Sequence, residues 1–261
     1  MEVIAIVNQK GGVGKTTSCI NLASALAVAG KKILLIDLDP QGNSSSGLGV
    51  ELENRKENIY ETLINNLPIE KSSKKTAIEN LEVCPATVDL SAAELEIAQI
   101  ESREYLLKHK INQHKQNYDY IFIDCPPSLG MLTINALTAA DSLIIPMQCE
   151  YFALEGLSHL LKTIKIIKSK LNENLEIKGI LLSMYDKRNR LSAQVARDIK
   201  KYLGDKLFKT IIPRNVRVSE APSFGKPVLA YDINCPGSKA FIRLTKEILT
   251  NNSNLNYKHA R

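Results

Sequence analysis

The stretch that decides the fold follows an apolar N-terminal segment and reads Gln9-Lys10-Gly11-Gly12-Val13-Gly14-Lys15-Thr16-Thr17. It joins a predicted strand, Val3 to Asn8, to a helix with apolar periodicity. In that position small residues let backbone N–H groups converge on phosphate oxygens, and the helix N-terminus adds its positive dipole. Lys15 can then reach the β- and γ-phosphates, and Thr16 can ligate Mg²⁺. We therefore predict a phosphate-binding loop.

This loop departs from the common G-x-x-x-x-G-K-[ST] pattern, because Gln9 stands where the first Gly belongs. The remaining G-G-x-G-K-T-T core, with Lys10 ahead of it, still lies between a strand and a helix. A purely structural glycine turn is the alternative, and this context disfavours it. The nucleotide-binding residues expected from the loop are Gly11, Gly12, Val13, Gly14, Lys15, Thr16 and Thr17.

Two further predicted strands end in carboxylates. Alternation along the strand from Lys32 points Asp37 and Asp39 the same way. The apolar run Tyr120-Ile121-Phe122-Ile123 ends in Asp124, which is the Walker B arrangement. Carboxylates at the carboxyl edge of a parallel sheet can hold Mg²⁺ or orient a water for attack on the γ-phosphate. For Asp39, which precedes Pro-x-Gly, an ordinary turn is the alternative.

Short Val/Ile/Leu-rich runs alternate with longer helical segments along the chain, and this alternation is typical of βαβ units around a parallel sheet. The predicted strands are Val3–Asn8, Lys32–Asp37, Leu81–Pro85, Tyr120–Asp124, Ser142–Pro146, Ile177–Met184 and Thr210–Ile212. The predicted helices are Thr16–Ala29, Leu90–His114, Met131–Ala139, Ala153–Leu171, Ala193–Leu203 and Lys239–Leu249. We predict an α/β fold, with a mostly parallel twisted sheet and helices on both faces, of the P-loop NTPase type.

Composition places the chain among ordinary globular proteins, since 44% of its 261 residues are hydrophobic and 24% are charged. We expect one ATPase domain over residues 1–250 and a polar, disordered tail over 251–261. Without a secretory signal pattern or a long apolar run, a soluble cytoplasmic protein is expected. The five cysteines, never in C-x-x-C spacing, predict buried free thiols rather than disulfides or a zinc site. We expect Cys125 to be such a packed thiol.

Charge is distributed unevenly around the net value of +6. Residues 1–150 carry 13 Lys and Arg against 19 Asp and Glu, whereas residues 151–261 carry 21 against 9. A basic C-terminal part can attract a polyanion such as nucleic acid. The alternative is that the many lysines reflect the composition of the genome.

Taken together, the loop Lys10–Thr17 and the segments Asp37–Asn43 and Asp124–Ser128 resemble the deviant-Walker ATPases of the ParA/MinD superfamily. Three further segments narrow the resemblance to its ParA/Soj branch: Gln148–Gly156, Met184–Arg188 and Ile212–Pro227. The match covers the chain up to about Leu249 in the right motif order. It implies a nucleotide switch in which ATP and Mg²⁺ close two subunits into a sandwich dimer, and hydrolysis opens it.

The resemblance also implies a role for each matched position. Lys10 is the signature lysine that reaches into the partner's nucleotide site, and Gly12 permits close approach at the dimer interface. Lys15 and Thr16 serve phosphate and Mg²⁺, and Asp39 positions the attacking water. The remaining implied positions are Asp37 and Asp124 in the metal shell, and Pro213, Arg214 and Asn215 against the adenine.

For partners, the resemblance implies double-stranded DNA bound without sequence preference, and a centromere-binding protein of the ParB/Spo0J type that stimulates a slow ATPase. Arg188 and Arg217 match positions implicated in DNA binding, and guanidinium groups suit phosphates. A surface salt bridge is the alternative for each. Lys200, Lys201, Arg243 and Lys246 are weaker candidates. A nucleoid-associated protein that partitions chromosomes or plasmids is therefore expected.

Three alternatives remain open. A MinD-like ATPase that cycles on membranes requires a C-terminal amphipathic helix, and Phe241, Leu244, Ile248 and Leu249 do form an apolar stripe. A helix docked on the core explains that stripe equally, so no stable membrane association is expected. An electron-transferring iron protein like that of nitrogenase requires cysteines in Gly-rich segments, which Cys84 and Cys125 lack. A nucleotide-gated DNA-binding scaffold with incidental turnover is the third.

Overall fold

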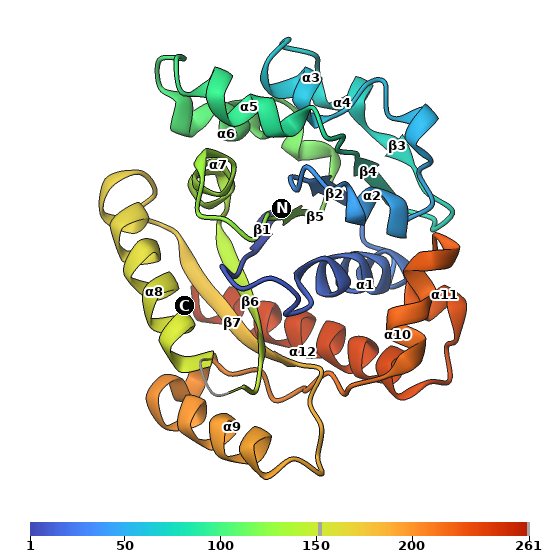
Figure 1. Ribbon diagram of the computed structural model, residues 1–261, viewed down its shortest axis with the longest axis vertical. Coiled ribbons are helices and arrows are strands. Elements are labelled where there is room, and N and C mark those ends of the chain that lie inside the picture. The colour runs from blue at the N-terminus through green and yellow to red at the C-terminus, as the bar shows by residue number, and fades with distance from the viewer. Residues whose placement is uncertain (151–152, 260–261) are drawn as a thin grey trace.

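A computed structural model of the chain describes residues 1–150 and 153–259, and its centre is a seven-stranded sheet of order β3-β4-β2-β5-β1-β6-β7 (Figure 1). Every neighbouring pair is parallel except β3 and β4. The strands are β1 Glu2–Ile6, β2 Ile33–Asp37, β3 Lys74–Lys75, β4 Leu81–Cys84, β5 Tyr120–Asp124, β6 Ser142–Gln148 and β7 Glu176–Ser183. The predicted mostly parallel α/β sheet is confirmed.

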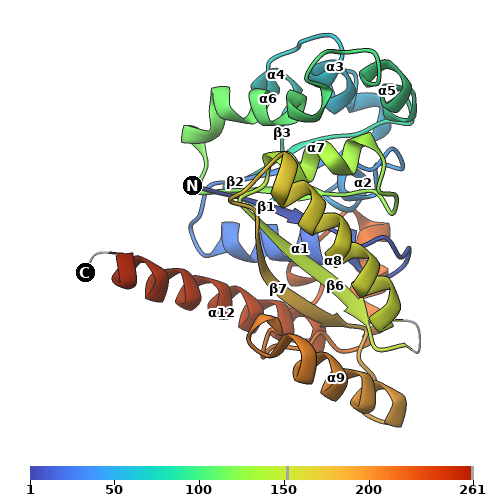
Figure 2. The same ribbon diagram turned by 90° about the vertical axis from the view of Figure 1, so that its left-hand side faces the viewer.

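Helices cover both faces of this sheet (Figures 1 and 2). The α-helices are α1 Lys15–Val28, α2 Asn43–Gly47, α3 Ile59–Leu63, α4 Ile69–Ser72, α5 Leu90–Ile97, α6 Leu106–His114, α7 Met131–Ala139, α8 Ala153–Lys170, α9 Arg190–Leu203, α10 Val216–Glu220, α11 Val228–Tyr231 and α12 Pro236–His259. The 3-10 turns are η1 Leu52–Asn54, η2 Arg103–Tyr105, η3 Lys115–Asn117, η4 Gly204–Lys206 and η5 Ala221–Phe224.

Strand alternation divides the core into two layers. In β1, Val3 and Ala5 pack with α5 to α9 on one face, whereas Ile4 and Ile6 pack with α1, α11 and α12 on the other. Both sets are almost fully buried, which explains why β1 and β5 read as continuous apolar runs. The sheet is thus held rigid from both sides, and its strand ends project from a fixed frame.

The structure differs from the predicted elements in three places. The predicted helix Leu90–His114 breaks into α5 and α6, and Ser102 in the break has a left-handed φ of 55°. The predicted strand Thr210–Ile212 is absent from the described sheet, where only isolated bridges join Leu207 and Pro213 to the β7 region. Helix α12 runs to His259, because neither Gly nor Pro follows Leu249 to end it. The division at residue 250 stays a prediction.

The apolar stripe of α12 packs into the core. Phe241, Leu244 and Ile248 are fully buried, and α12 lies against α1. In the described part of the chain, none of the helices combines the length and the apolar character of a membrane span. A docked helix therefore explains the stripe.

Candidate active site

The loop between β1 and α1 has the backbone shape of a phosphate cradle. Gly12 and Gly14 have left-handed φ values of 73° and 85°, which side chains other than glycine rarely adopt. The space beside Gly11 and Gly12 is open, because a Cβ built on either would meet no atom within 4 Å. Helix α1 begins at Lys15 without a side-chain cap, so its first N–H groups are left for another acceptor.

Lys15 is buried over this loop. Its side chain folds back so that Nζ donates to the carbonyl oxygen of Lys10 at 3.3 Å. Burial lowers the pKa of Lys15, and the nearby Asp124 and Asp39 partly offset that effect. A desolvated cation beside a carbonyl is poorly compensated, so an anion at this position would be strongly favoured.

Asp37 and Asp124 lie side by side at the carboxyl ends of β2 and β5, where they are register partners. Both are fully buried. Asp37 accepts hydrogen bonds from the backbone N–H and hydroxyl of Ser45 at 2.8 and 2.7 Å, and Asp124 Oδ2 accepts one from Ser44 at 2.7 Å. The other oxygen, Asp124 Oδ1, has no partner among the described residues.

Burial raises the pKa of both carboxyl groups. For Asp124 the proximity of Asp37 raises it further, while the nearby hydroxyls of Ser44 and Thr16 lower it in part. Two adjacent buried carboxylates resist full ionisation unless a cation shares the site. The pair is thus arranged to gain from a metal ion.

Asp39 follows Asp37 by two residues, and it forms the turn that was weighed as the alternative to a functional role. Its Oδ1 accepts the backbone N–H of Gln41 at 3.0 Å, and its carbonyl oxygen accepts that of Gly42 at 2.9 Å. The carboxylate is nonetheless buried and close enough to Lys15 to influence its pKa. The structure therefore brings Asp37, Asp39 and Asp124 together beside Lys15.

Lys10 contrasts with Lys15. Its side chain is half exposed, and its Nζ forms an ion pair with the carboxylate of Glu150, just beyond β6. Asn8 fixes the base of the loop, because its Oδ1 accepts the N–H of Lys10 at 3.0 Å and its Nδ2 donates to Pro146 at 2.7 Å. The sequence analysis assigned no role to Glu150. The available signal was an acidic residue just after β6, the strand that pairs with β1.

The end of β7 links the loop to the segment expected at the adenine. Ser183 donates to the carbonyl oxygen of Val13 at 2.7 Å, and Met184, with a left-handed φ of 48°, follows it. Tyr185 then forms an isolated β-bridge with Pro213, and its carbonyl oxygen accepts the N–H of Arg214 at 3.1 Å. The next residue along, Asn215, has a buried Oδ1 without a described partner. The sequence offered no signal for Ser183.

Arg188 and Arg217 lie outside this cluster, on the surface. Arg188 makes two hydrogen bonds with Asp186, at 3.0 and 2.8 Å. Arg217 pairs with Glu220 at 3.0 Å and lies over the ring of Tyr231. The ion pairs weighed as alternatives are therefore formed in this structure.

Cys125 matches its prediction. It is buried, and burial together with Asp124 raises its pKa well above the ordinary value. All five cysteines are free and buried. An inert, packed thiol follows.

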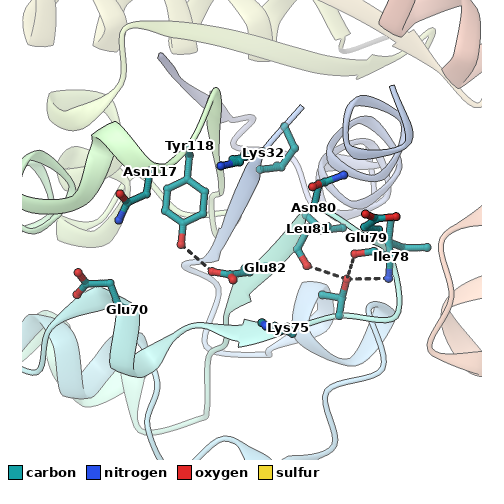
Figure 3. A pocket seen from close by; sticks show the side chains of 12 residues that line it. Lys32, Glu70, Lys75, Ile78, Glu79, Asn80, Leu81, Glu82, Asn117 and Tyr118 are labelled. Carbon is teal, nitrogen blue, oxygen red and sulfur yellow. Dashed lines mark hydrogen bonds between the residues drawn. The ribbon is translucent and has the colours of Figure 1, made fainter. Parts of the chain in front are cut away.

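The opposite edge of the sheet carries an open hollow of a different kind (Figure 3). It lies at the amino ends of β2, β4 and β5, where the hydroxyl of Tyr118 donates to Glu82 at 2.7 Å. Its lysines and glutamates are mixed around the rim and converge on no single point (Figure 3). Ligands of open α/β sheets bind at the carboxyl edge, where the loop and the three carboxylates are.

Comparison with known proteins agrees with this geometry. Residues 1–177 match a family model described as an AAA domain. The sporulation initiation inhibitor protein Soj of Bacillus subtilis is 53% identical over 96% of this chain and 99% of its own length. The chromosome-partitioning ATPase Soj of Treponema pallidum is 50% identical over 95% and 97%. This chain belongs to the Soj/ParA family of chromosome-partitioning ATPases.

Solved structures support the same fold for the Soj/ParA chain. A putative plasmid partition protein of Borrelia burgdorferi bound to AMPPNP aligns with a TM-score of 0.81 and 30% identity over 96% of this chain and 98% of its own. Cobyrinic acid a,c-diamide synthase of Mycobacterium smegmatis, with an ATP analogue and magnesium, aligns with a TM-score of 0.83 and 32% identity over 100% and 97%.

The residues of this Soj/ParA chain fit magnesium and a nucleoside triphosphate. The glycine loop leaves room beside Gly11 and Gly12, and Lys15 supplies a buried cation. Asp124 Oδ1 is a buried oxygen, unpartnered in the part of the chain that the structure describes, and of the type that Mg²⁺ prefers. The uncapped start of α1 supplies N–H donors.

Proposed function

We propose that this chain is a DNA-partitioning ATPase whose ATP-bound form is a sandwich dimer that holds double-stranded DNA without sequence preference. Hydrolysis, accelerated by a centromere-binding protein of the ParB/Spo0J type, releases the DNA, so that the protein cycles on and off the nucleoid. The observation that carries this proposal is the juxtaposition of Lys10 and Lys15 on one loop with Asp37, Asp39 and Asp124.

Bound MgATP would supply the reactive phosphoryl group and the metal charge that stabilises it. Lys15 neutralises the phosphates, because it is already desolvated and poorly compensated. Asp37 and Asp124 would hold the metal shell with Thr16, and Oδ1 of Asp124, which has no partner among the described residues, is the first available oxygen. Asp39 orients the attacking water, an interaction that matters on the way to the transition state rather than in the ground state.

Lys10 is the residue that makes the dimer catalytic. In the free chain its ammonium group is held by Glu150 on the same subunit. An exposed ion pair of this kind contributes only about 0–1 kcal/mol, so that Lys10 can leave it at little cost. Across the dimer the same cation would stabilise charge on the partner's transferring phosphoryl group.

The segment Pro213-Arg214-Asn215 packs against the base. Its attachment to Tyr185, two residues after the loop-anchoring Ser183, supports this assignment. So does Oδ1 of Asn215, which has no partner among the described residues and can accept a hydrogen bond from an exocyclic amine. Base recognition and phosphate binding then share one end of β7.

The basic half supplies the DNA surface. Helix α9 is strongly amphipathic, and Arg190, Arg197, Lys200 and Lys201 are all exposed. Arg188 lies two residues before the start of α9, and Arg217 comes from α10. Phosphate contacts of this kind position a protein without reading bases.

The test uses Asp39→Ala protein, because without an oriented water it should bind ATP yet hydrolyse it about 100- to 10,000-fold more slowly. Labelled random duplex is titrated with this variant in ATP, in ADP and without nucleotide. We expect an ATP-dependent dimer and DNA binding that needs ATP. Equal DNA affinity without nucleotide, or wild-type turnover by Asp39→Ala, would contradict the proposal.

A further inference from the structure

A buried arginine supports the segment that follows Asp39. Arg55 comes directly after the 3-10 turn η1 and is 6% exposed. Carbonyl and hydroxyl oxygens surround its guanidinium group, and no carboxylate in the described part of the chain forms an ion pair with it. Because a charge without a counter-ion is costly to bury, a side chain that only filled this space would be better apolar. The guanidinium therefore points to a need for its directed hydrogen bonds.

All five N–H groups of this guanidinium have an acceptor. Nη1 donates to the carbonyl oxygens of Gly42 and Ala86, both at 3.2 Å. Nη2 donates to Ser46 Oγ at 2.8 Å and to the carbonyl oxygen of Val50 at 2.6 Å, and Nε donates to that same carbonyl at 3.0 Å. Three of the four acceptor residues belong to α2 and its flanks, and Ala86 lies just beyond β4. The planar fork thus ties the α2 segment to the edge of the sheet.

The carbonyl group of Gly42 connects Arg55 to the turn of Asp39. Gly42 closes this turn, since its N–H donates to the Asp39 carbonyl oxygen at 2.9 Å. Gly42 has a left-handed φ of 62°, and a Cβ built on it would collide with Nη1 of Arg55. The guanidinium therefore lies directly against the backbone of the turn.

The other carboxylates of the site have supports of their own. Asp37 and Asp124 are the last residues of β2 and β5, where strand pairing and hydrogen bonds from serines of α2 fix them. Asp39 lies beyond the last paired residue of β2, so its position depends on the turn that Gly42 closes. Loss of the guanidinium should therefore displace Asp39 more than the two carboxylates beside it.

We propose that Arg55 is a positioning residue for ATP hydrolysis. It holds the Gly42 carbonyl and the start of α2 against the end of β4, and so sets the Asp39 carboxylate in the orientation that aligns the attacking water. The inference rests on the proposed role of Asp39, through which Arg55 acts. Binding of ATP depends instead on the phosphate loop and Lys15, and does not require Arg55.

The test compares Arg55→Met, which keeps much of the apolar stem but none of the donors, with wild type. We expect hydrolysis in a single turnover to slow about 10- to 100-fold, because misplacement by about 1 Å can cost 100-fold in rate. The Kd for MgATP should change by less than about threefold, since an oriented water matters only on the way to the transition state. Far-UV circular dichroism and the thermal midpoint establish that the variant is folded.

Arg103→Met is the matched control. Arg103 also donates to a backbone carbonyl, that of Ala98, but it lies between α5 and α6, so the rate should stay at the wild-type value. Should Arg55→Met fail to fold, Arg55→Lys carries the comparison. Its ammonium group retains the charge but cannot span acceptors on both sides, and we expect hydrolysis about three- to tenfold slower with unchanged ATP affinity.

A double-mutant cycle separates positioning of Asp39 from a general loss of structure. In the Asp39→Ala background, Arg55→Met should lower the residual hydrolysis by less than about twofold, because the carboxylate that it positions is gone. A purely structural role predicts the same loss of rate in both backgrounds.

Three results would overturn the proposal. They are wild-type hydrolysis by folded Arg55→Met, a loss of MgATP affinity large enough to explain the slower rate, and an equal loss of rate with and without Asp39. When Asp39→Ala is slow, any of these overturns the role of Arg55 alone. Wild-type turnover by Asp39→Ala would overturn the proposed role of Asp39 as well, so the two failures are distinguishable.

Discussion

The carboxyl edge of the sheet and the basic surface around α9 and α10 hold their charged groups in opposite ways. Asp37 and Asp124 are buried, bonded by neighbouring serines and fixed by two parallel strands. Arg188 and Arg217 are exposed; Arg188 pairs with Asp186 two residues away, and Arg217 pairs with Glu220 three residues away and with Asp232 on the following segment. The first arrangement is preorganised for a ligand of fixed geometry, whereas the second exchanges its partners at low cost. The proposed ATP chemistry and the proposed DNA binding would thus place different demands on one chain.

The phosphate loop repeats this contrast within five residues, and it gives the largest expected effect. Lys15→Ala should weaken ATP binding by about 100-fold or more, because it removes a buried cation that makes charge-assisted contacts to phosphate. Lys10→Ala should keep ATP binding but lose the ATP-dependent dimer and hydrolysis. Equilibrium nucleotide binding and analytical ultracentrifugation, with Asp39→Ala in the background, separate the two lysines.

Glu150→Gln is the control for this comparison. It frees Lys10 without altering the loop, so ATP binding should stay unchanged and the dimer should form at equal or lower protein concentration. If Lys10→Ala still dimerises in the Asp39→Ala background, the role of Lys10 across the interface is wrong, and Glu150 is merely a surface partner.

An intermediate effect is expected on stability. The raised pKa of Asp124 means that the folded chain pays for a buried carboxylate, so Asp124→Asn should raise the free energy of unfolding by about 1–2 kcal/mol at pH 8 while weakening Mg²⁺-dependent ATP binding. Because the pKa of Asp124 is higher in the folded chain than in the unfolded chain, the destabilisation by its carboxylate is fully present above the folded pKa. It disappears as the pH falls to the ordinary value, about 4.

Urea unfolding of wild type and Asp124→Asn from pH 8 to pH 4, without nucleotide, measures this difference in the free energy of unfolding. The advantage of Asp124→Asn should shrink steadily toward pH 4. Asp141→Asn is the matched control, because its exposed carboxylate accepts the N–H of Val3 at the opposite edge and should show no such gain. A destabilised Asp124→Asn at pH 8 would mean that its hydrogen bonds outweigh the buried charge.

The sequence was most informative where one local rule decides the structure. The glycine loop required left-handed backbone at Gly12 and Gly14, and apolar strands ending in Asp37 and Asp124 placed both carboxylates at one edge. Those features depend on spacing alone, which a single sequence displays.

Contacts between distant segments were not accessible in this way. Glu150 meets Lys10 across 140 residues, and Ser183 reaches Val13 across 170. The break at Ser102 lies inside a pattern that still reads as one helix, because its apolar spacing continues on both sides. Tertiary packing determines these long-range contacts and this helix break, and local sequence propensity does not predict them.

The smallest effect concerns the arginines. Arg188→Ala and Arg217→Ala should each lower DNA affinity for any sequence equally and reduce the slope of log affinity against log salt by about 0.9 per lost phosphate contact. The effect is modest because the Arg188 guanidinium must first leave Asp186, and that of Arg217 must leave Glu220 and Asp232. ATP binding should survive both changes. A salt titration with Asp39→Ala protein and ATP measures the slope, and Lys32→Ala, an exposed cation at the amino edge, is the control. If both arginine variants keep the wild-type slope, these ion pairs stay closed when DNA binds. The side chains that contact DNA phosphates must then lie elsewhere, and Lys200 and Lys201 on α9 are the next to test.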